Sequence, residues 1–240
     1  MNIPSQKNSV MPEAIILAGG LGTRLKSEVP DLPKCMAPVA GKPFIDYVIK
    51  YLIEQGVNGF IFSLGYKHDV VINHLESTWP NIKYEVAIEK NPLGTGGGIR
   101  FASKKVKSKS FFVLNGDTYF DVDLLSMFKN HESNNAQITV ALKQMVNFDR
   151  YGSVLINETN QISAFREKTS VDSGLINGGI YLIKKSLIEE ISVEDPFSCE
   201  KEVLEKYIQK NFIYGFVSDG YFIDIGIPED FKKANADFNK

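Results

Sequence analysis

Cysteine, histidine and long apolar runs are scarce in this 240-residue sequence, and each shortage excludes a class of protein. Two cysteines, Cys35 and Cys199, are too few for a disulfide framework and lack the spacing of a zinc site. No apolar run approaches the roughly 20 residues that span a bilayer, and the polar N-terminus does not resemble a signal peptide. A formal net charge of −2, with acids and bases mixed throughout, excludes a basic surface for nucleic acid or membrane. We therefore expect a cytoplasmic protein with reduced thiols.

Short apolar runs that end at glycine, asparagine or aspartate alternate with helical patterns along the chain. Strands are predicted at 14–18, 59–64, 84–88 and 111–114, and helices at 44–55, 70–75 and after the glycine-rich stretch 94–98 through Ala102. Further strands at 138–143, 152–156 and 162–167 lack long helices between them, which indicates some antiparallel pairing. The pattern predicts a single-domain α/β protein, a three-layer αβα sandwich with a mixed, mostly parallel Rossmann-like sheet. We expect this domain to span residues 13–240, with residues 1–12 as a flexible extension.

A glycine-rich turn follows the first predicted strand, where open α/β sheets bind ligands. Its sequence is Leu17-Ala18-Gly19-Gly20-Leu21-Gly22-Thr23-Arg24-Leu25. Glycines let several backbone N–H groups approach an anion, and Arg24 adds a forked cation suited to phosphate oxygens. A dinucleotide fingerprint would need glycine at Leu25, and a P-loop would need Gly-Lys-Ser/Thr, so neither fits. The turn therefore predicts phosphate binding of another kind, with a tight turn beside a surface arginine as the structural alternative.

Several motifs in this order resemble the sugar-nucleotide pyrophosphorylases. They are Gly-Gly-x-Gly-Thr-Arg-Leu, Pro33-Lys34-Cys35-Met36-Ala37-Pro38-Val39, Pro92-Leu93-Gly94-Thr95-Gly96-Gly97, Asn115-Gly116-Asp117, Asn177-Gly178-Gly179-Ile180-Tyr181 and Asp224-Ile225-Gly226. The resemblance covers nearly everything from Glu13 onward. It implies a glycosyltransferase-A-like nucleotidyltransferase fold and an enzyme that joins a nucleoside monophosphate from an NTP to a sugar 1-phosphate, releasing pyrophosphate. The nucleotide-binding residues it implies are Leu17, Ala18, Gly19, Gly20, Gly22, Thr23, Glu89, Gly94 and Thr95.

Two aspartates, Asp117 and Asp224, each end an apolar run and so lie at the predicted ligand edge of the sheet. Hard oxygen ligands of this kind suit Mg²⁺, which takes one or two carboxylates together with waters and substrate phosphates. From the residues alone, an Asx-turn for Asp117 and a helix N-cap for Asp224 remain alternatives. The resemblance assigns both aspartates to a catalytic Mg²⁺.

The predicted reaction needs cations rather than a general base. A sugar 1-phosphate is already mostly ionised near neutral pH, because the second phosphate pKa is about 6. Catalysis then consists mainly of in-line positioning and neutralisation of charge. The resemblance implies that Arg24 neutralises the departing pyrophosphate and Lys34 the phosphorus under attack, with Asp117 as the third catalytic residue. The sugar-phosphate-binding residues it implies are Asn115, Gly152, Glu167, Lys168, Asn177 and Gly178.

Base and sugar preferences are predicted from Glu89 and from a closer resemblance. A carboxylate accepts hydrogen bonds, and guanine offers two adjacent donors, N1–H and N2–H₂, so we expect GTP as the donor. The stretches 142–152, 174–179 and 221–226 resemble the D-glycero-α-D-manno-heptose 1-phosphate guanylyltransferases, which implies GDP-heptose synthesis for surface polysaccharide or glycoprotein. Mannose 1-phosphate or another sugar 1-phosphate stays open as acceptor.

A second class of function is also conceivable, namely a regulatory subunit that binds nucleotide sugars without catalysis. Such a protein would be expected to lack a metal carboxylate or a phosphate-binding cation. Here Arg24, Lys34, Asp117 and Asp224 are all present, which favours the enzyme. No nucleic-acid or membrane partner is expected, and the sequence leaves the oligomeric state open, with a homodimer among the alternatives.

Overall fold

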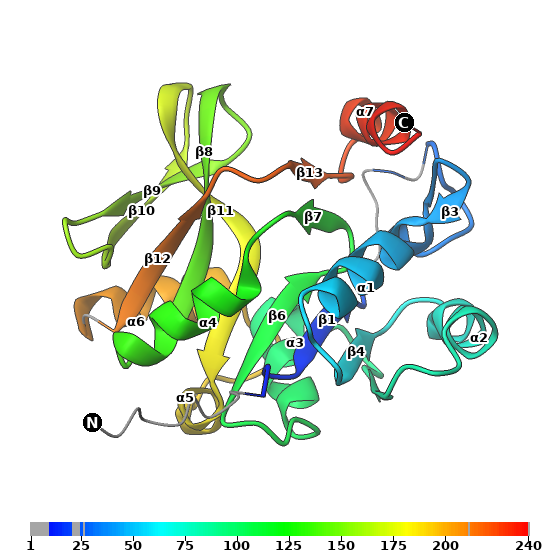
Figure 1. The fold of residues 1–240 in the computed structure, drawn as a ribbon, viewed down its shortest axis with the longest axis horizontal. Helices are drawn as coiled ribbons and strands as arrows, with labels where there is room; N and C mark the ends of the chain where they lie inside the picture. The colour runs from blue at the N-terminus through cyan, green and yellow to red at the C-terminus, as the bar shows by residue number, and fades with distance from the viewer. Residues whose placement is uncertain (1–9, 21–24, 26, 211, 240) are drawn as a thin grey trace, which may run out of the picture.

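In the part of the chain that the computed structural model describes, residues 10–20, 25, 27–210 and 212–239, nine strands form one mixed sheet (Figure 1). The strand order is β10-β9-β11-β6-β1-β4-β5, with β8 beside β11 and β12 beside β8. The strands of this sheet are β1 (Ala14–Ala18), β4 (Phe60–Leu64), β5 (Tyr84–Ile88), β6 (Ser110–Asn115), β8 (Ile138–Phe148), β9 (Gly152–Ile156), β10 (Ile162–Lys168), β11 (Val171–Lys184) and β12 (Ile213–Ser218). Two small ladders join β2 (Pro38–Val39) to β3 (Lys42–Pro43) and β7 (Thr118–Phe120) to β13 (Phe222–Asp224).

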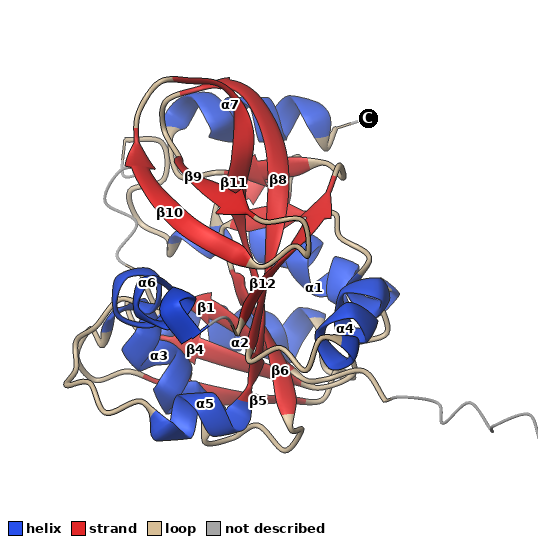
Figure 2. Ribbon diagram, turned by 90° about the vertical axis from the view of Figure 1, so that its left-hand side faces the viewer, coloured by secondary structure: helices blue, strands red, loops and turns tan. Residues whose placement is uncertain are grey.

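Helices cover both faces of this sheet (Figure 2). The α-helices are α1 (Phe44–Glu54), α2 (His68–Thr78), α3 (Gly94–Ser103), α4 (Leu124–Ser133), α5 (Lys185–Glu190), α6 (Glu205–Tyr207) and α7 (Pro228–Asp237). Shorter 3₁₀ turns are η2 (Lys34–Met36) and η4 (Ile208–Lys210), and η3 (Glu200–Leu204) is a π-helix. Within the described ranges, no helix combines the length and the apolar character that crossing a bilayer requires.

The alternation of side chains along the strands separates two hydrophobic cores. Ala14 and Ile16 of β1 face one core, which α1, α2, α4 and α7 cover. Ile15 faces the other, under α3, α5 and the π-helix. Because successive strand residues point to opposite faces, a continuous apolar strand such as β1 must be covered on both sides. This arrangement confirms the predicted three-layer sandwich.

Strand directions also follow the prediction. β6, β1, β4 and β5 are parallel, as alternating strands and helices require, and the ranges predicted for β1 and β5 are those observed. In the second half of the chain, β9 pairs antiparallel with β10, and β11 pairs antiparallel with β6, β8 and β9. The expected antiparallel pairing in this region is therefore confirmed.

Several boundaries were predicted wrongly: α2 spans His68–Thr78 instead of 70–75, β8 ends at Phe148 instead of 143, and α3 begins earlier than expected. The helix expected after the glycine-rich stretch begins within it, since α3 starts at Gly94 and includes Gly96, Gly97 and Gly98. Glycine disfavours helix interiors, which is why the sequence pattern placed the start later. Close packing against another segment outweighs this preference, as described below for the site.

His131 of α4 is a buried polar side chain that makes the stability of the protein depend on pH. It is fully buried, and its Nδ1 lies 2.9 Å from Thr139 Oγ1. Burial, assisted by the charge of Lys184, lowers its pKa from 6.5 to about 4. The unfolded chain therefore takes up a proton in this range while the folded protein does not, so the free energy of unfolding must fall as pH falls from about 6.5 to about 4.

We expect this histidine to contribute up to about 3 kcal/mol to the acid-induced loss of stability. Urea unfolding of the wild type and of His131→Gln, each at about pH 7 and about pH 5, measures the part of that contribution lost by pH 5, about 2 kcal/mol. The glutamine variant cannot titrate, so its stability should change less between the two pH values. An equal loss of stability in the two proteins would contradict the assignment.

Candidate active site

A cleft of about 560 Å³ opens at the carboxyl ends of β1 and β6, where the sequence predicted a ligand site. Many of the predicted site residues line it: Leu17, Gly19, Gly20, Glu89, Gly94 and Thr95 for the nucleotide, Lys34 for catalysis, Asn115 for the sugar phosphate, and Asp117 and Asp224 for the metal. Three further residues complete the lining, Ser63, Pro92 and Thr118. The topology thus gathers segments that are up to two hundred residues apart in the sequence.

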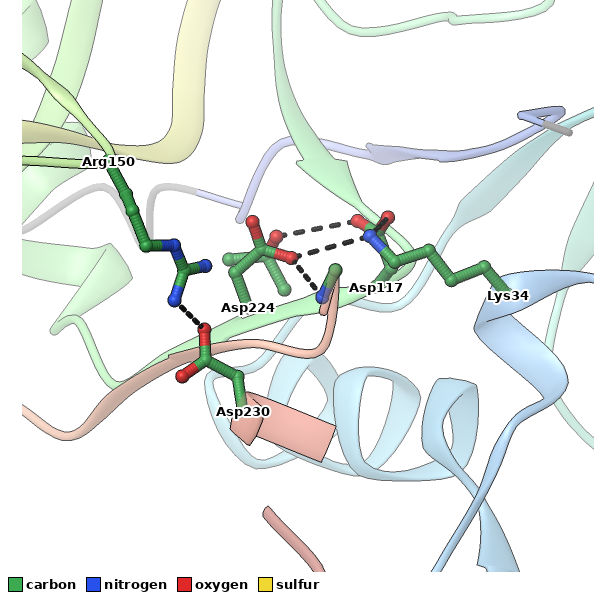
Figure 3. A network of polar contacts seen from close by, with 7 residues as sticks. Lys34, Asp117, Arg150, Asp224 and Asp230 are labelled. Carbon is green, nitrogen blue, oxygen red and sulfur yellow. Dashed lines mark hydrogen bonds and ion pairs between the residues drawn. The ribbon is translucent and has the colours of Figure 1, made fainter. Parts of the chain in front are cut away.

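The two aspartates predicted to bind metal meet in this cleft (Figure 3). Asp117 follows β6, and Asp224 ends β13, whose pairing with β7 sets Asp224 opposite Thr118. The backbone N–H of Ile225 donates to the carbonyl oxygen of Asp117 at 3.1 Å. The ammonium of Lys34 touches both carboxylates, with Nζ 2.5 Å from Asp117 Oδ2 and 3.4 Å from Asp224 Oδ1. One cation therefore lies between the two carboxylates.

The electrostatics of this cluster leave a surplus of negative charge. Burial and the neighbouring charge of Asp117 raise the pKa of Asp224, while Lys34 and the N–H of Gly226 act to lower it. Two carboxylates face one ammonium, so the ionised cluster carries a net charge of −1. Such a site favours an additional positive charge.

A divalent metal ion fits these residues. Oxygen atoms are the ligands that Mg²⁺ and similar hard cations prefer, and the Lys34 ammonium shows that the two carboxylates can share one cation. No group of three or more acidic, histidine or cysteine side chains suited to a metal occurs among the described residues. A metal held here would therefore take its remaining ligands from water and substrate, as Mg²⁺ commonly does.

Lys34 is held by the short turn η2, which is anchored by two apolar neighbours. Cys35 and Met36 are both buried, and the N–H of Met36 donates to the carbonyl oxygen of Pro33. Burial, followed by the charge of Asp117, raises the pKa of the Cys35 thiol to about 12. Cys35 therefore packs as a small apolar side chain, with its thiol protonated at neutral pH.

Glu89 is fixed at the other end of the cleft. Its Oε1 accepts a hydrogen bond from Ser63 Oγ at 3.0 Å, and its Oε2 accepts one from the backbone N–H of Leu93 at 3.1 Å. A Cβ at Gly98 would lie 2.7 Å from Glu89 Oε1, so the glycine makes room for the carboxylate. Ser63 was not predicted, although it is the polar residue in the apolar strand β4.

The glycines of α3 are explained by a segment that the sequence did not connect with the site. A Cβ at Gly94 would lie 2.4 Å from the carbonyl oxygen of Phe197, and one at Gly96 would lie 2.2 Å from the Phe197 ring. A Cβ at Gly97 would lie 2.3 Å from Asp195 Oδ1. The backbone N–H of Gly96 also donates to the Phe197 carbonyl oxygen. The glycines thus let residues 195–199 pack directly on the start of α3.

Glu200, the first residue of the π-helix, links residues predicted to serve different substrates. Its Oε2 accepts from Thr95 Oγ1 at 2.9 Å, and its Oε1 accepts from the Tyr181 hydroxyl at 3.3 Å. Tyr181 in turn accepts from Asn177 Nδ2 at 2.9 Å. Burial raises the pKa of Tyr181, so its hydroxyl remains a donor. Nothing in the sequence distinguishes Glu200 from its acidic neighbours, and only the fold reveals this connection.

The remaining predicted sugar residues lie away from the lining of this cleft. Glu167 and Lys168 are exposed at the end of β10, where Lys168 pairs with Gly152 of β9. Gly178 packs against the ring of Phe120, where a Cβ would lie 2.4 Å from a ring carbon. Ala18 is buried beside the turn. The predicted residues Gly22, Thr23 and Arg24 lie outside the described residues.

Comparison with known proteins agrees with this geometry. The family model described as nucleotidyl transferase matches residues 13–240. The D-glycero-α-D-manno-heptose 1-phosphate guanylyltransferase of Aneurinibacillus thermoaerophilus is 47% identical over 226 residues, which cover 94% of this chain and 97% of that protein. The mannose-1-phosphate guanylyltransferase of Mycobacterium tuberculosis is 33% identical over 229 residues, which cover 94% of this chain and 64% of that protein.

Solved structures give the same result. The crystal structure of HddC from Yersinia pseudotuberculosis is 41% identical, with a TM-score of 0.86, and the match covers 95% of this chain and 100% of HddC. The same protein complexed with GMP-PN matches with a TM-score of 0.84 at 40% identity over the same shares. Together with the family match over 228 residues, from 13 to 240, these relatives place the chain in the nucleotidyl transferase family.

Proposed function

We propose that this protein transfers GMP from GTP to D-glycero-α-D-manno-heptose 1-phosphate, with Mg²⁺ as the cofactor, to give GDP-heptose and pyrophosphate. The observation that carries the proposal is the pair of carboxylates, Asp117 and Asp224, facing Lys34 at the carboxyl end of the sheet. Two polyanionic substrates can approach each other only where their charge is neutralised. The cleft offers the acidic pair that would hold a metal ion and a lysine beside it.

The reaction is a displacement at the α-phosphorus of the nucleotide. An oxygen of the sugar 1-phosphate forms the new bond to this phosphorus, and the bond to the bridging oxygen of the β-phosphate breaks. The electron pair leaves with pyrophosphate, and no proton needs to be moved, because the attacking phosphate is already ionised. A bound metal ion would neutralise phosphate charge and orient the oxygens.

The residues of the chain bind and orient the substrates. Backbone N–H groups at Gly19 and Gly20, which line the cleft, would bind the phosphates, and Arg24 is assigned to the departing pyrophosphate. When substrate and metal bind, the metal ion would neutralise the two carboxylates in place of Lys34. The Lys34 ammonium would then move to the α-phosphate. Asn115 and Asn177 are assigned to the sugar phosphate, together with Gly152, Glu167, Lys168 and Gly178.

Guanine is proposed as the base because of Glu89. Its carboxylate is already oriented by Ser63 and Leu93, and it retains lone pairs for N1–H and N2–H₂ of guanine. Glu89→Gln should lower kcat/KM for GTP by about 10- to 100-fold, since hydrogen bonds to a charged group contribute about 1.5–3 kcal/mol. Turnover of a panel of GTP, ATP, UTP, CTP and dTTP measures the preference.

Glu85→Gln is the matched control for this prediction, because Glu85 lies on β5, the strand that ends one residue before Glu89, is exposed and pairs with Lys105. It should leave kcat/KM for GTP unchanged. A wild-type preference for a pyrimidine nucleotide would reject guanine, and an unaltered GTP preference in Glu89→Gln would reject the role of Glu89.

D-glycero-α-D-manno-heptose 1-phosphate is proposed over mannose 1-phosphate as the acceptor because of the similarity to the two relatives. The heptose guanylyltransferase matches at higher identity and along nearly its whole length, whereas the mannose enzyme extends well beyond the match. Competition between the two sugar 1-phosphates for the purified protein decides between them, and a higher kcat/KM for mannose 1-phosphate would reject heptose.

The alternative of a regulatory, non-catalytic protein is tested by pyrophosphate release. An enzyme releases pyrophosphate only when both GTP and the sugar 1-phosphate are present, and a non-catalytic protein releases none.

A further inference from the structure

Arg150 lies in the connection between β8 and β9 and reaches toward the acidic pair. Its Nη1 is 2.7 Å from Oδ2 of Asp230, in the first turn of α7, six residues after Asp224. Figure 3 shows its guanidinium joined to Asp230 below it, with Asp224 on the side toward Lys34. Among the catalytic and binding residues assigned above, Arg150 does not appear.

A second contact fixes the same connection on the other side of Asp224. The ring of Tyr151 packs edge-on against that of Phe222, with centroids 5.9 Å apart. Phe222 precedes Asp224 by two residues on β13. Residues 149–151 are therefore tied to the polypeptide both before and after this aspartate, which holds the Arg150 backbone in a defined place over the site.

Arg150 keeps its positive charge and has N–H donors available for an anionic ligand. Burial acts to lower the pKa of Arg150, but the hydrogen bond with Asp230 and then the charges around it, including that of Asp224, raise it above its usual value. The ion pair occupies only part of the guanidinium, which has five N–H donors in a fork suited to phosphate. The Arg150 side chain is 40% exposed, against 20% for Asp230, so the free donors can reach a ligand.

The chain also connects Arg150 to the predicted sugar pocket. Gly152 follows it by two residues and pairs with Lys168 on the neighbouring strand β10. Arg150 is thus linked to the acidic region through Asp230 and, along the chain, to Gly152 and Lys168, two of the residues assigned to the sugar phosphate. The phosphate of the acceptor must lie in this region if its oxygen is to attack beside the metal.

We infer that Arg150 binds the phosphate group of the sugar 1-phosphate and that Asp230 is the positioning residue that orients it. The inference rests on the proposed function. A competing explanation is that the ion pair only fastens the β8–β9 connection to α7, with no contact to substrate. The two explanations differ in whether KM for the sugar 1-phosphate rises selectively, and in whether lysine at position 150 partly restores it.

Steady-state kinetics of Arg150→Gln, Arg150→Lys and Asp230→Asn separate them. Arg150→Gln should raise KM for the sugar 1-phosphate by about 10- to 100-fold with KM for GTP unchanged, since a charge-assisted hydrogen bond to phosphate is lost. Arg150→Lys should give an intermediate KM, because it keeps the charge without the fork. Asp230→Asn should have a smaller effect in the same direction. Lys232→Gln removes an exposed charge from the same helix and should change neither constant.

Three results would overturn the inference. The first is an unchanged KM for the sugar phosphate in Arg150→Gln. The second is an equal rise in both KM values, and the third is equal losses in Arg150→Gln and Asp230→Asn without partial rescue by lysine. Thermal unfolding of each variant shows whether the fold is retained. If the wild type releases no pyrophosphate with GTP and any sugar 1-phosphate, the proposed function itself fails, whereas an active wild type with an unaffected Arg150→Gln rejects only this inference.

Discussion

Asp117→Asn is expected to lower kcat by about 10³-fold or more while the protein stays folded. The change keeps the size of the side chain but removes the negative charge that, with Asp224, would hold the metal ion. Removing a single group that stabilises charge in a transition state commonly costs about 10²–10³ in kcat, and loss of a metal carboxylate should reach the upper end of this range. Pyrophosphate release at saturating GTP, sugar 1-phosphate and Mg²⁺ measures the effect.

Stability should hardly change in this variant. Asp117 is partly exposed, its side chain being 29% accessible, and its segment is held by backbone hydrogen bonds that the substitution leaves in place, from Gly116 to Leu17 and from Ile225 to Asp117. Asp219→Asn, at an exposed position, is the matched control and should retain full activity. Turnover of Asp117→Asn within a few-fold of the wild type, or undiminished wild-type activity after complete chelation, would show that no metal ion is held here.

The central part of the fold could be predicted because its signals are local. Continuous apolar runs that stop at glycine or at Asn-Gly-Asp identify β1 and β6, and the carboxyl ends of parallel strands meet at one edge by geometry. Asp117 follows such a strand, whereas Asp224 reaches the site from the antiparallel β7–β13 ladder, and the resemblance was what assigned the two aspartates, 107 positions apart, to one metal site. Glu89 and Lys34 follow from the same reasoning combined with the resemblance.

Among the segments that escaped prediction, some have conformations that depend on distant contacts. β11 is the longest strand in the described residues, yet Gly174, Gly178 and Gly179 interrupt its pattern, and a bulge between Asn177 and Tyr181 shifts its register. The start of α3 depends on residues 195–197, which lie a hundred positions further along the chain. The role of Glu200 likewise becomes visible only through its hydrogen bond with the distant Thr95. Glycine in a sequence signals that something approaches closely, but it does not say what.

Lys34→Met should abolish catalysis and, in the same protein, strengthen metal binding in the absence of substrate. The ammonium of Lys34 contacts both carboxylates, so it occupies the position of a cation and competes with a metal ion for them. With lysine, the ionised cluster carries −1, and with methionine it carries −2. One extra unit charge at about 4 Å changes the interaction with a cation by about 4 kcal/mol at an effective dielectric constant of about 20.

Even after solvent screening, we expect the affinity for Mg²⁺ without nucleotide to rise at least about tenfold. The dependence of the thermal unfolding midpoint on Mg²⁺ concentration measures it, because a ligand that binds only the folded state raises that midpoint. Lys50→Met, at an exposed pair on α1, should behave as the wild type does. A smaller Mg²⁺ shift in Lys34→Met than in the wild type would mean that lysine helps to build the metal site. The expected larger shift would mean that Lys34 pairs with the two carboxylates only until the metal ion binds them. The Lys34 ammonium is then free to bind the phosphate of the substrate.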